Sequence, residues 1–464
     1  MKARQILAFI ASVIALIALV GELFPRAGIT LAGRHVGFAS LQTLVDERQP
    51  TPKETVEAEA PELALLRDSV DYYRALVNRG DLRFWLPNPH YFDSFWSAAE
   101  KARSSGRILR VLHYGDSQIE MDHLTSRLRV YMQRTFGGGG PGMLPARPIT
   151  PTFTVSQSTS DKLIHLASFG DSSVVRSRGD YGPMMQCFRL TGGNAATTIR
   201  ASKSKSVDPN VKQFSRLTLL YNNRGSKLDA TLVDRQHKAS LPTQSSTQSG
   251  IGHFEWQLDS ACNALRLSVH GNADLYGLLV DDGPGVAVDN IPMRGCSGQQ
   301  FTLVPVDKLS AAYRQMDVGL ILLQFGGNSV PYLKTSEKIS TYCQSLGRQI
   351  DHLHQCCPQA RILFIGPSDM SIRLRGQLQT YPVLPELIDS LAATAVAHHA
   401  AYWSIYHAMG GSGSMVEWVR QGLAGQDYIH FSQRGADLMG DRLSQALANS
   451  YSLYRLERKA KRKK

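Results

Sequence analysis

The sequence has a low share of charged residues and only six cysteines in 464 residues. Charged residues make up 19% of the chain and hydrophobic residues 43%, which excludes an intrinsically disordered protein and indicates a globular one. A chain of this length can bury a substantial core and form two or three domains.

The cysteines and histidines do not form a metal-binding pattern. One group lacks the second pair of ligands that a zinc site needs, so we interpret it as a helix end: His352, His354, Cys356 and Cys357. We therefore expect no metal and no cofactor. If the chain is exported, two disulfide pairings stay open: Cys187 with Cys262, and Cys343 with either Cys356 or Cys357.

Two further binding signatures are incomplete. The run Gly137–Gly142 follows a predicted helix and no Gly-Lys-Ser/Thr ends it, which excludes a phosphate loop and favours a flexible exit from that helix. The basic tail at residues 451–464 has seven Lys and Arg against Glu457 but no aromatic interleaving, so we expect no nucleic-acid partner. A solvated, frayed helix end is our interpretation of the tail; contact with anionic lipid or an acidic polymer is the alternative.

The N-terminus has the pattern of an export signal. Lys2 and Arg4 precede Ile6–Gly21, sixteen uncharged and mostly aliphatic residues. We expect residues 1–26 to be an uncleaved signal anchor, or transmembrane helix, that leaves the rest of the chain periplasmic and attached to the inner membrane. A cleaved signal and a buried helix are the alternatives. Residues 27–80 read as a proline-rich tether followed by a helix at Leu63–Val77.

The most informative segment is His-Tyr-Gly-Asp-Ser-Gln-Ile-Glu-Met-Asp at residues 113–122. It lies between the strand-like run Ile108–Leu112 and a helix-patterned segment at Leu124–Phe136. A serine at such a strand-to-helix transition, here Ser117, stands at the carboxyl end of a strand, where backbone N–H groups can stabilise an oxyanion. Helix capping would explain the same residues equally well if the segment stood alone.

Three later segments carry residues that could act together with Ser117. Asp427 and His430 precede a helical run at the spacing at which an aspartate can orient a histidine base. Asn290–Gly298 and Leu323–Asn328 both follow apolar runs, so both should reach the carboxyl edge of one parallel sheet.

These four ordered segments resemble the blocks of the SGNH, or GDSL-type, hydrolases. The resemblance implies that Ser117 is the nucleophile, His430 the general base and Asp427 its orienting partner. It also assigns the oxyanion hole to the Ser117 and Gly295 backbone N–H groups and the Asn328 amide. One departure is Ser329, which stands where many members of the family have an acidic residue.

The implied fold is α/β: a three-layer, flavodoxin-like α/β/α sandwich with an inserted all-β domain. Buried parallel strands are predicted at Val318–Gln324, Arg361–Ile365 and Ala401–Tyr406, with helices at Glu337–Leu353, Leu384–His399 and Gln433–Ala448. Short strand-like runs between turn residues predict a jelly-roll-like β-sandwich at 146–280. It splits the hydrolase domain into residues 81–145 and 281–450.

The architecture resembles exported bacterial peptidoglycan O-acetylesterases that carry an inserted β-sandwich. The resemblance implies an esterase that removes O-acyl, specifically O-acetyl, groups from an acylated cell-envelope glycan. The same residues would also serve an O-acetyltransferase with a membrane-bound acyltransferase partner, and a non-catalytic envelope-binding protein is the third alternative. The insert would bind carbohydrate, or would only shape the cleft or contact another subunit.

Overall fold

The computed structural model describes residues 61–77, 83–159, 163–170 and 181–463, the strands β1 (Ile29–Leu31) and β2 (Arg34–Val36), and single helical residues between Gln5 and Leu23. The chain divides into two units, Met1–Ala64 and Leu65–Lys464. The expected anchor at residues 1–26 lies largely outside the described residues. Within the described part of the chain, no helix is both long and apolar enough to span a bilayer.

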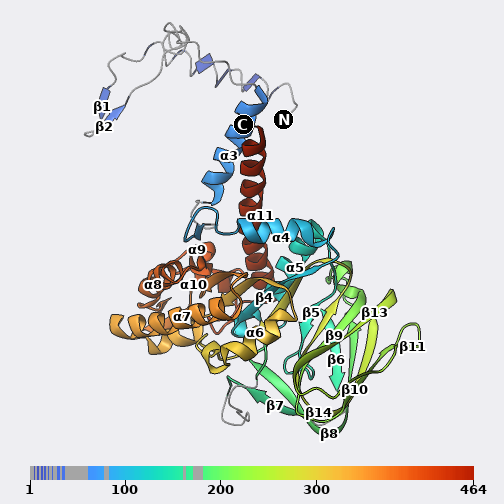
Figure 1. Ribbon diagram of the computed structural model, residues 1–464. Helices are drawn as coiled ribbons and strands as arrows, with labels where there is room; N and C mark the ends of the chain where they lie inside the picture. The colour runs from blue at the N-terminus through green and yellow to red at the C-terminus, as the bar shows by residue number, and fades with distance from the viewer. Residues whose placement is uncertain are drawn as a thin grey trace. The chain divides into compact units, whose positions relative to one another are not determined.

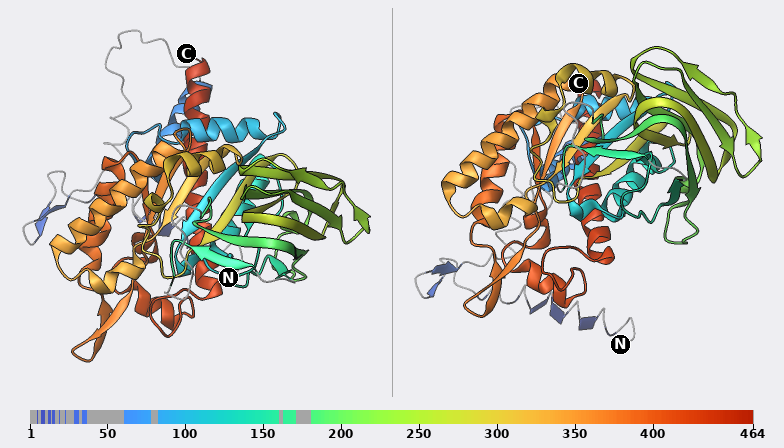
Figure 2. Two further views of the ribbon diagram at one scale, coloured as in Figure 1. Left: turned by 60° about the horizontal axis from the view of Figure 1, so that its bottom comes forward. Right: turned by 90° about the horizontal axis from the view of Figure 1, so that it is seen from below.

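A six-stranded sheet forms the centre of the second unit (Figures 1 and 2). Its strands, in spatial order, are β15 (Gly285–Pro292), β4 (Ile108–Gly115), β16 (Val318–Gln324), β17 (Arg361–Gly366), β20 (Ala401–Ser404) and β3 (Phe84–Trp85). The first five are parallel, and β3 pairs antiparallel with β20. Numbered along the chain, the parallel strands follow the doubly wound order 2-1-3-4-5.

Helices cover both faces of this sheet, as its continuous apolar strands require. One face packs against α4 (Asp93–Ala102), α5 (His123–Phe136), α9 (Ile405–Met409), α10 (Ser414–Arg420) and α11 (Gln433–Lys463). The other packs against α6 (Val306–Arg314), α7 (Ser336–Cys356) and α8 (Leu384–Ala397). The predicted α/β class is therefore confirmed, and α7 ends at Cys356 as the helix-end interpretation required.

One predicted strand in the C-terminal half is shorter than expected. The strand predicted at Ala401–Tyr406 is present but ends at Ser404, because the Ser404 side chain accepts the His407 N–H and caps α9. The glycine-rich segment that follows contains α10. A small hairpin, β18 (Ser371–Leu374) and β19 (Gln377–Thr380), follows β17.

The insert is all-β, as predicted, and forms one ten-stranded antiparallel sheet that contains the long strand β14 (Ala264–Asp281). Along one edge of β14 the partner changes from β8, which pairs up to Leu275, to β5, which pairs from Leu278; along the other edge β9 pairs from Ala273 onward. The jelly-roll arrangement itself stays a prediction. The other strands are β5 (Gly142–Leu144), β6 (Val155–Thr159), β7 (Ile164–Ala167), β8 (Gln186–Ala201), β9 (Phe214–Asn223), β10 (Leu228–Asp234), β11 (Ala239–Ser240), β12 (Gln244–Ser246) and β13 (Gly250–Cys262).

The insert and the parallel sheet share a hydrophobic core. Met184 and Tyr276 of the insert belong to the same buried cluster as Tyr114 on β4 and Phe301. The Tyr114 hydroxyl also donates to the Pro183 carbonyl at 2.5 Å. The two sheets are therefore packed as one body in this region.

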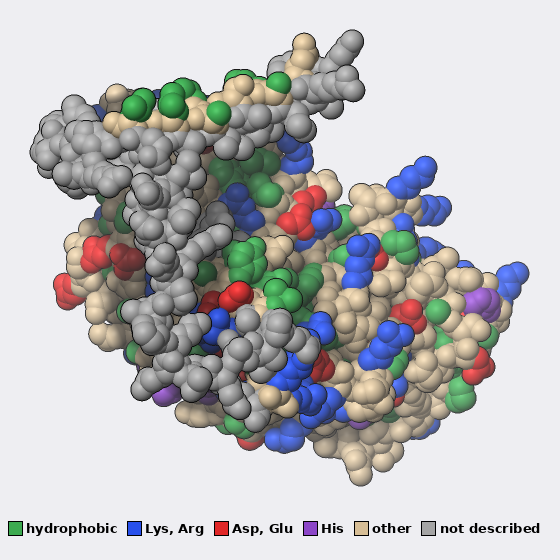
Figure 3. Space-filling view, turned by 90° about the horizontal axis from the view of Figure 1, so that it is seen from above, with side chains coloured by type: hydrophobic (Ala, Val, Ile, Leu, Met, Phe, Trp, Pro, Cys, Tyr) green, Lys and Arg blue, Asp and Glu red, His purple; other side chains and the backbone are tan. Residues whose placement is uncertain are grey.

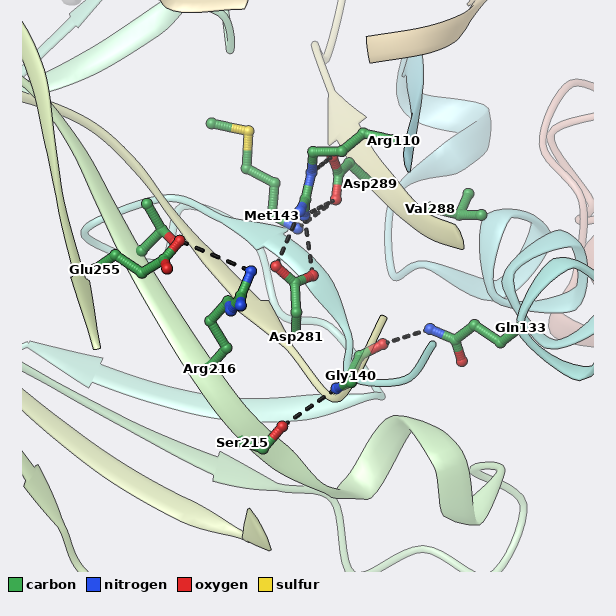
Figure 4. Close-up of polar contacts among 12 residues, drawn as sticks. Arg110, Gln133, Gly140, Met143, Ser215, Arg216, Glu255, Asp281, Val288 and Asp289 are labelled. Atoms are coloured by element: carbon green, nitrogen blue, oxygen red, sulfur yellow. Dashed lines mark hydrogen bonds and ion pairs between the residues drawn. The ribbon is translucent and has the colours of Figure 1, made fainter. Parts of the chain in front are cut away.

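A buried charge cluster lies at the same junction (Figure 4). Arg110 on β4 pairs with Asp289 on β15 at 2.8 Å and with Asp281 at the end of β14 at 2.9 Å, and no side chain of the three is more than 2% exposed. One guanidinium thus neutralises carboxylates from both sheets, and burial raises the pKa of Asp281 despite this cation.

The glycine run at the entry to the insert is closely packed, which contradicts the expected flexible exit. A Cβ on Gly140 would lie 2.5 Å from the Val280 carbonyl oxygen, and one on Gly142 would lie 2.5 Å from the Asp289 carboxylate. Gly140 also has φ +83°, and its carbonyl accepts the Gln133 amide at 2.9 Å (Figure 4). Glycine is needed here because two backbones cross without room for side chains.

The cysteines and the basic tail also have clear places. Neither open disulfide pairing forms: Cys262, Cys343, Cys356 and Cys357 are free thiols, and all four are buried. The tail is not frayed: α11 continues to Lys463, and Glu457 on it pairs with Arg74 on α3 (Pro61–Val77) at 2.8 Å. On the face seen in Figure 3, Lys and Arg side chains lie among acidic, apolar and other polar ones.

Candidate active site

The nucleophile candidate stands directly at the carboxyl end of the central strand. β4 ends at Gly115, and Ser117 begins a single 3₁₀ turn, Ser117–Ile119. Asp116 caps this turn, since its carboxylate accepts the Gln118 N–H at 3.0 Å. A Cβ on Gly115 would lie 3.0 Å from the Ile119 side chain, so the tight turn favours glycine there.

Ser117, His430 and Asp427 form one hydrogen-bonded chain. Ser117 Oγ lies 2.8 Å from His430 Nε2, and His430 Nδ1 lies 2.7 Å from Asp427 Oδ2. The other carboxylate oxygen of Asp427 accepts the backbone N–H groups of Ile429 and His430 at 3.0 and 3.1 Å. The structure thus brings Ser117 to two residues that lie more than three hundred positions later in the sequence.

The electrostatics of this chain favour an ionised aspartate. Burial acts to raise the pKa of Asp427, but hydrogen bonds from the His430 ring and from two backbone N–H groups outweigh it and lower the pKa. An ionised Asp427 can only accept a hydrogen bond, so Nδ1 of His430 carries the proton. Nε2 is then an acceptor facing the Ser117 hydroxyl.

The two expected oxyanion-hole residues lie beside Ser117. Gly295 has φ +72° in a turn closed by the Cys296 N–H and the Met293 carbonyl at 3.0 Å. Asn328 is the second residue of a 3₁₀ segment, Gly327–Tyr332. Ser117, Gly295, Asn328 and His430 line one cavity of about 540 Å³. All the predicted site residues except Asp427 therefore face the same cleft, and Asp427 is bound to His430.

Asp116 has a positioning role that the sequence did not reveal. It is 5% exposed, and its Oδ2 accepts the Asn328 amide at 3.2 Å, while the same amide nitrogen donates to the Cys296 carbonyl at 3.1 Å. Burial, partly offset by the Gln118 N–H bond, raises the pKa of Asp116 to about 6. One carboxylate therefore fixes both the nucleophile turn and the Asn328 side chain.

Gln118 was also missed. Its amide nitrogen donates to the Ile429 carbonyl at 2.6 Å and to Ser368 Oγ at 3.2 Å, and its amide oxygen accepts the Phe431 N–H at 3.2 Å. These bonds hold the backbone on both sides of His430. The only available signal was its position next to Ser117, since its partners are at least 250 residues away.

His113, in the same sequence segment, is no candidate base. It is completely buried between Gln324, at 3.2 Å, and Thr125, at 2.9 Å. Burial lowers its pKa to about 3, so the ring stays neutral inside the core. Among the described residues, no group of three His, Cys, Asp or Glu side chains is arranged to hold a metal ion.

The loop after Ser117 is strained and is held by the insert. Met121 and Asp122 have φ of 65° and 67°, values that residues other than glycine rarely adopt. Asp122 is held by Arg129 at 2.7 Å and by Thr154 of the insert at 2.9 Å. The insert residue Phe153 also donates its N–H to the Met121 carbonyl at 3.3 Å.

An exposed ion pair joins this loop to the Gly295 turn. Arg294 meets Glu120 with two N–H groups, one of them at 2.6 Å from Glu120 Oε1. Since Glu120 lies three residues after Ser117 and Arg294 directly precedes Gly295, the pair fixes two sides of the cleft relative to each other.

Comparisons with known proteins agree with this fold. No family model and no curated protein matches the chain. A solved structure described as "Peptidoglycan O-acetylesterase in action, 5 min" matches 77% of this chain and 95% of its own, with 21% identity and a TM-score of 0.62.

Two other solved structures give weaker matches. One is a family two carbohydrate esterase from Cellvibrio japonicus, at 12% identity, covering 64% of this chain and 99% of its own, with a TM-score of 0.26. The other is an acetyl xylan esterase, at 10% identity, covering 35% and 81%, with a TM-score of 0.28. The chain thus shares the fold of a solved peptidoglycan O-acetylesterase, over a length that the parallel-sheet domain alone could not supply.

Proposed function

We propose that the protein is a serine esterase of SGNH type that removes O-acyl groups, specifically O-acetyl groups, from a cell-envelope carbohydrate. The observation that carries this proposal is the hydrogen-bonded chain of Ser117, His430 and Asp427 beside Gly295 and Asn328 in one open cleft. The bonding order matches what nucleophilic acyl transfer requires: nucleophile, base, orienting carboxylate.

The reaction then follows from the geometry. His430 Nε2 takes the Ser117 proton as Oγ attacks the ester carbonyl, and Asp427 stabilises the imidazolium. The tetrahedral intermediate collapses when His430 returns the proton to the sugar oxygen, which leaves as an alcohol. Water, activated by the same histidine, hydrolyses the acyl-serine to acetate and free Ser117.

The oxyanion is stabilised by the Ser117 and Gly295 backbone N–H groups and by the Asn328 amide. In the structure the Asn328 amide nitrogen donates to Asp116 and to the Cys296 carbonyl, so the side chain exchanges one of these two bonds for a bond to the oxyanion. One such donor contributes about 3 kcal/mol to transition-state stabilisation. Asp116 acts through Asn328 and does not itself contact substrate.

The substrate class and location are part of the proposal. The likeness to a solved peptidoglycan O-acetylesterase supports an acetylated envelope glycan. Basic residues before the apolar segment at 6–21 support export to the periplasm with attachment to the inner membrane. The proposed reaction requires no cofactor.

One experiment tests activity, nucleophile and location. The full chain is produced in cells whose outer membrane is permeabilised while the inner membrane stays intact. These cells are treated with a fluorophosphonate probe that cannot cross the inner membrane, and purified protein is assayed for acetate release from p-nitrophenyl acetate and O-acetylated glycan. The wild type should be labelled and active, and Ser117→Ala should lose both. Labelling of Ser117→Ala equal to the wild type would exclude Ser117 as nucleophile, and labelling only after lysis would contradict export.

The same assay distinguishes hydrolysis from transfer. The acyl-serine is common to both reactions, so the acceptor decides the outcome. Free acetate as the main product supports an esterase. Acetylated sugar formed at the expense of acetate when unmodified glycan is added would instead indicate an O-acetyltransferase, which a membrane-bound acyltransferase would supply with acyl groups.

A further inference from the structure

A second cavity lies between the insert and the hydrolase domain, next to the catalytic cleft. This interdomain pocket, about 360 Å³, is lined from the insert side by Ile149, Pro151 and Gln186 and from the hydrolase side by Asn290. It shares Glu120, Met121 and Arg294 with the cleft that holds Ser117. A ligand long enough to cross the Glu120–Arg294 pair would therefore occupy both cavities.

The charged residues of the pocket neutralise one another. Arg294 pairs with Glu120, and Arg129 pairs with Asp122 through two bonds at 2.7 and 3.0 Å. No other Lys, Arg, Asp or Glu lines the cavity among the described residues. An anionic or cationic ligand would lose its hydration there without gaining a counter-ion, so the pocket favours a neutral group.

The remaining lining is apolar with a few polar groups. Pro145, Ile149 and Phe169 provide apolar wall, while Thr150 and Gln186 place a hydroxyl and a carboxamide in the same cavity. A hydrocarbon chain would cover the Thr150 hydroxyl without offering it a hydrogen bond, at a cost of about 1–3 kcal/mol. The Gln186 amide oxygen already bonds to His165, at 2.9 Å. A sugar ring has apolar C–H faces and hydroxyl edges, which suit both parts of the lining.

We propose that the interdomain pocket is a subsite for a neutral sugar residue of the glycan chain, next to the acyl-bearing residue at Ser117. This rests on the proposed function, which it deepens by adding chain length and charge to the substrate. The enzyme then prefers an oligosaccharide to a single acetylated sugar, because only the longer substrate crosses the Glu120–Arg294 pair and reaches the pocket. Recognition uses the insert side of the pocket.

The test fills the pocket from the insert side. Ile149→Trp places an indole in it, and Ile164→Trp is the matched control, since both isoleucines lie on the insert and are 46% and 42% exposed, but Ile164 does not line the cavity. The readout is the ratio of kcat/KM for a neutral tetrasaccharide to that for a monosaccharide, each with one O-acetyl group. Ile149→Trp should lower the ratio by about tenfold, and Ile164→Trp should leave it unchanged.

The outcomes separate this inference from the proposed function. A wild-type ratio near one, or equal loss on both sugars in Ile149→Trp, would overturn the subsite while leaving the esterase intact. Wild-type turnover of p-nitrophenyl acetate without turnover of either sugar would instead overturn the carbohydrate substrate. An acetylated oligouronate of the same length should be a poorer substrate than the neutral tetrasaccharide; a preference for it would overturn the neutral assignment.

Discussion

At the scale of single residues, the site depends on side chains that do no chemistry themselves. Asp116 holds the Asn328 amide and the nucleophile turn, and Gln118 holds the backbone around His430. The sequence pointed to the proposed reacting groups because each lies in a short block with a known chemical role. It could not identify these two positioning residues, since their function lies in partners that only the fold brings near.

The raised pKa of Asp116 predicts a pH-dependent stability. Its pKa rises from 3.8 to about 6 on folding, so the folded state binds the proton more tightly, and stability falls as pH rises through this window. Above pH 6 the loss amounts to about 3 kcal/mol. Asp116→Asn lacks this titration, so its free energy of unfolding relative to wild type should increase by about 2 kcal/mol between pH 4 and pH 7, since the unfolded carboxyl is already partly ionised at pH 4.

Urea unfolding at several pH values measures this difference. A matched control is Asp441→Asn on α11, because Asp441 pairs with Arg127 at the surface, where both side chains are about half exposed. Its difference from wild type should change little over the same range. Parallel curves for wild type and Asp116→Asn would show that Asp116 is ionised normally in the folded protein.

At the scale of elements, apolar patterns predicted the hydrolase strands well. Val318–Gln324 matches β16 at both ends, because a strand buried on both faces is a continuous apolar run bounded by polar residues. The close approach of two backbone segments leaves no such pattern in the sequence. The close crossing at Gly140 and the continuation of α11 to Lys463 depend on neighbours from distant segments, so glycine was read as flexibility and charge as fraying.

The strand-like segment of the insert that contacts the nucleophile loop should affect catalysis. Thr154 donates to Asp122, which has a left-handed φ of 67°. This bond helps to hold the conformation of the loop that follows Ser117. Thr154→Val removes this bond to a charged group at little change in shape, and we expect kcat for p-nitrophenyl acetate to fall several-fold with KM nearly constant, and stability to fall by about 1.5–3 kcal/mol. Thr154→Ser keeps the hydroxyl and should restore kcat.

Steady-state kinetics at a temperature where both variants are folded separates positioning from stability. If Thr154→Val unfolds at a lower temperature but keeps the wild-type kcat, the bond is structural only. A rise in KM with constant kcat would place Thr154 in substrate binding instead, because it also lines the interdomain pocket.

At the scale of the whole molecule, the insert and the parallel-sheet domain share a hydrophobic core. The sequence predicted residues 146–280 as an inserted domain from their short strand-like runs. Tyr276 of the insert and Tyr114 on β4 lie in one buried cluster, and the Arg110 cluster also joins the two sheets. Nested domains with a shared core gain stability from each other, so neither should unfold alone.

Thermal unfolding of the full chain should therefore show one transition for both sheets. Arg110→Met leaves Asp281 and Asp289 buried without a cation, and should lower the free energy of unfolding by about 3–5 kcal/mol, moving the single transition as a whole. Arg127→Met is the matched control, because it breaks the exposed pair with Asp441, worth about 0–1 kcal/mol. Two separate transitions, or a shift confined to one of them in Arg110→Met, would show that the insert folds independently. A single shifted transition would mean that the insert and the sheet that carries Ser117 share one stability, so that a destabilising change in the insert also lowers the folded fraction of the proposed active site.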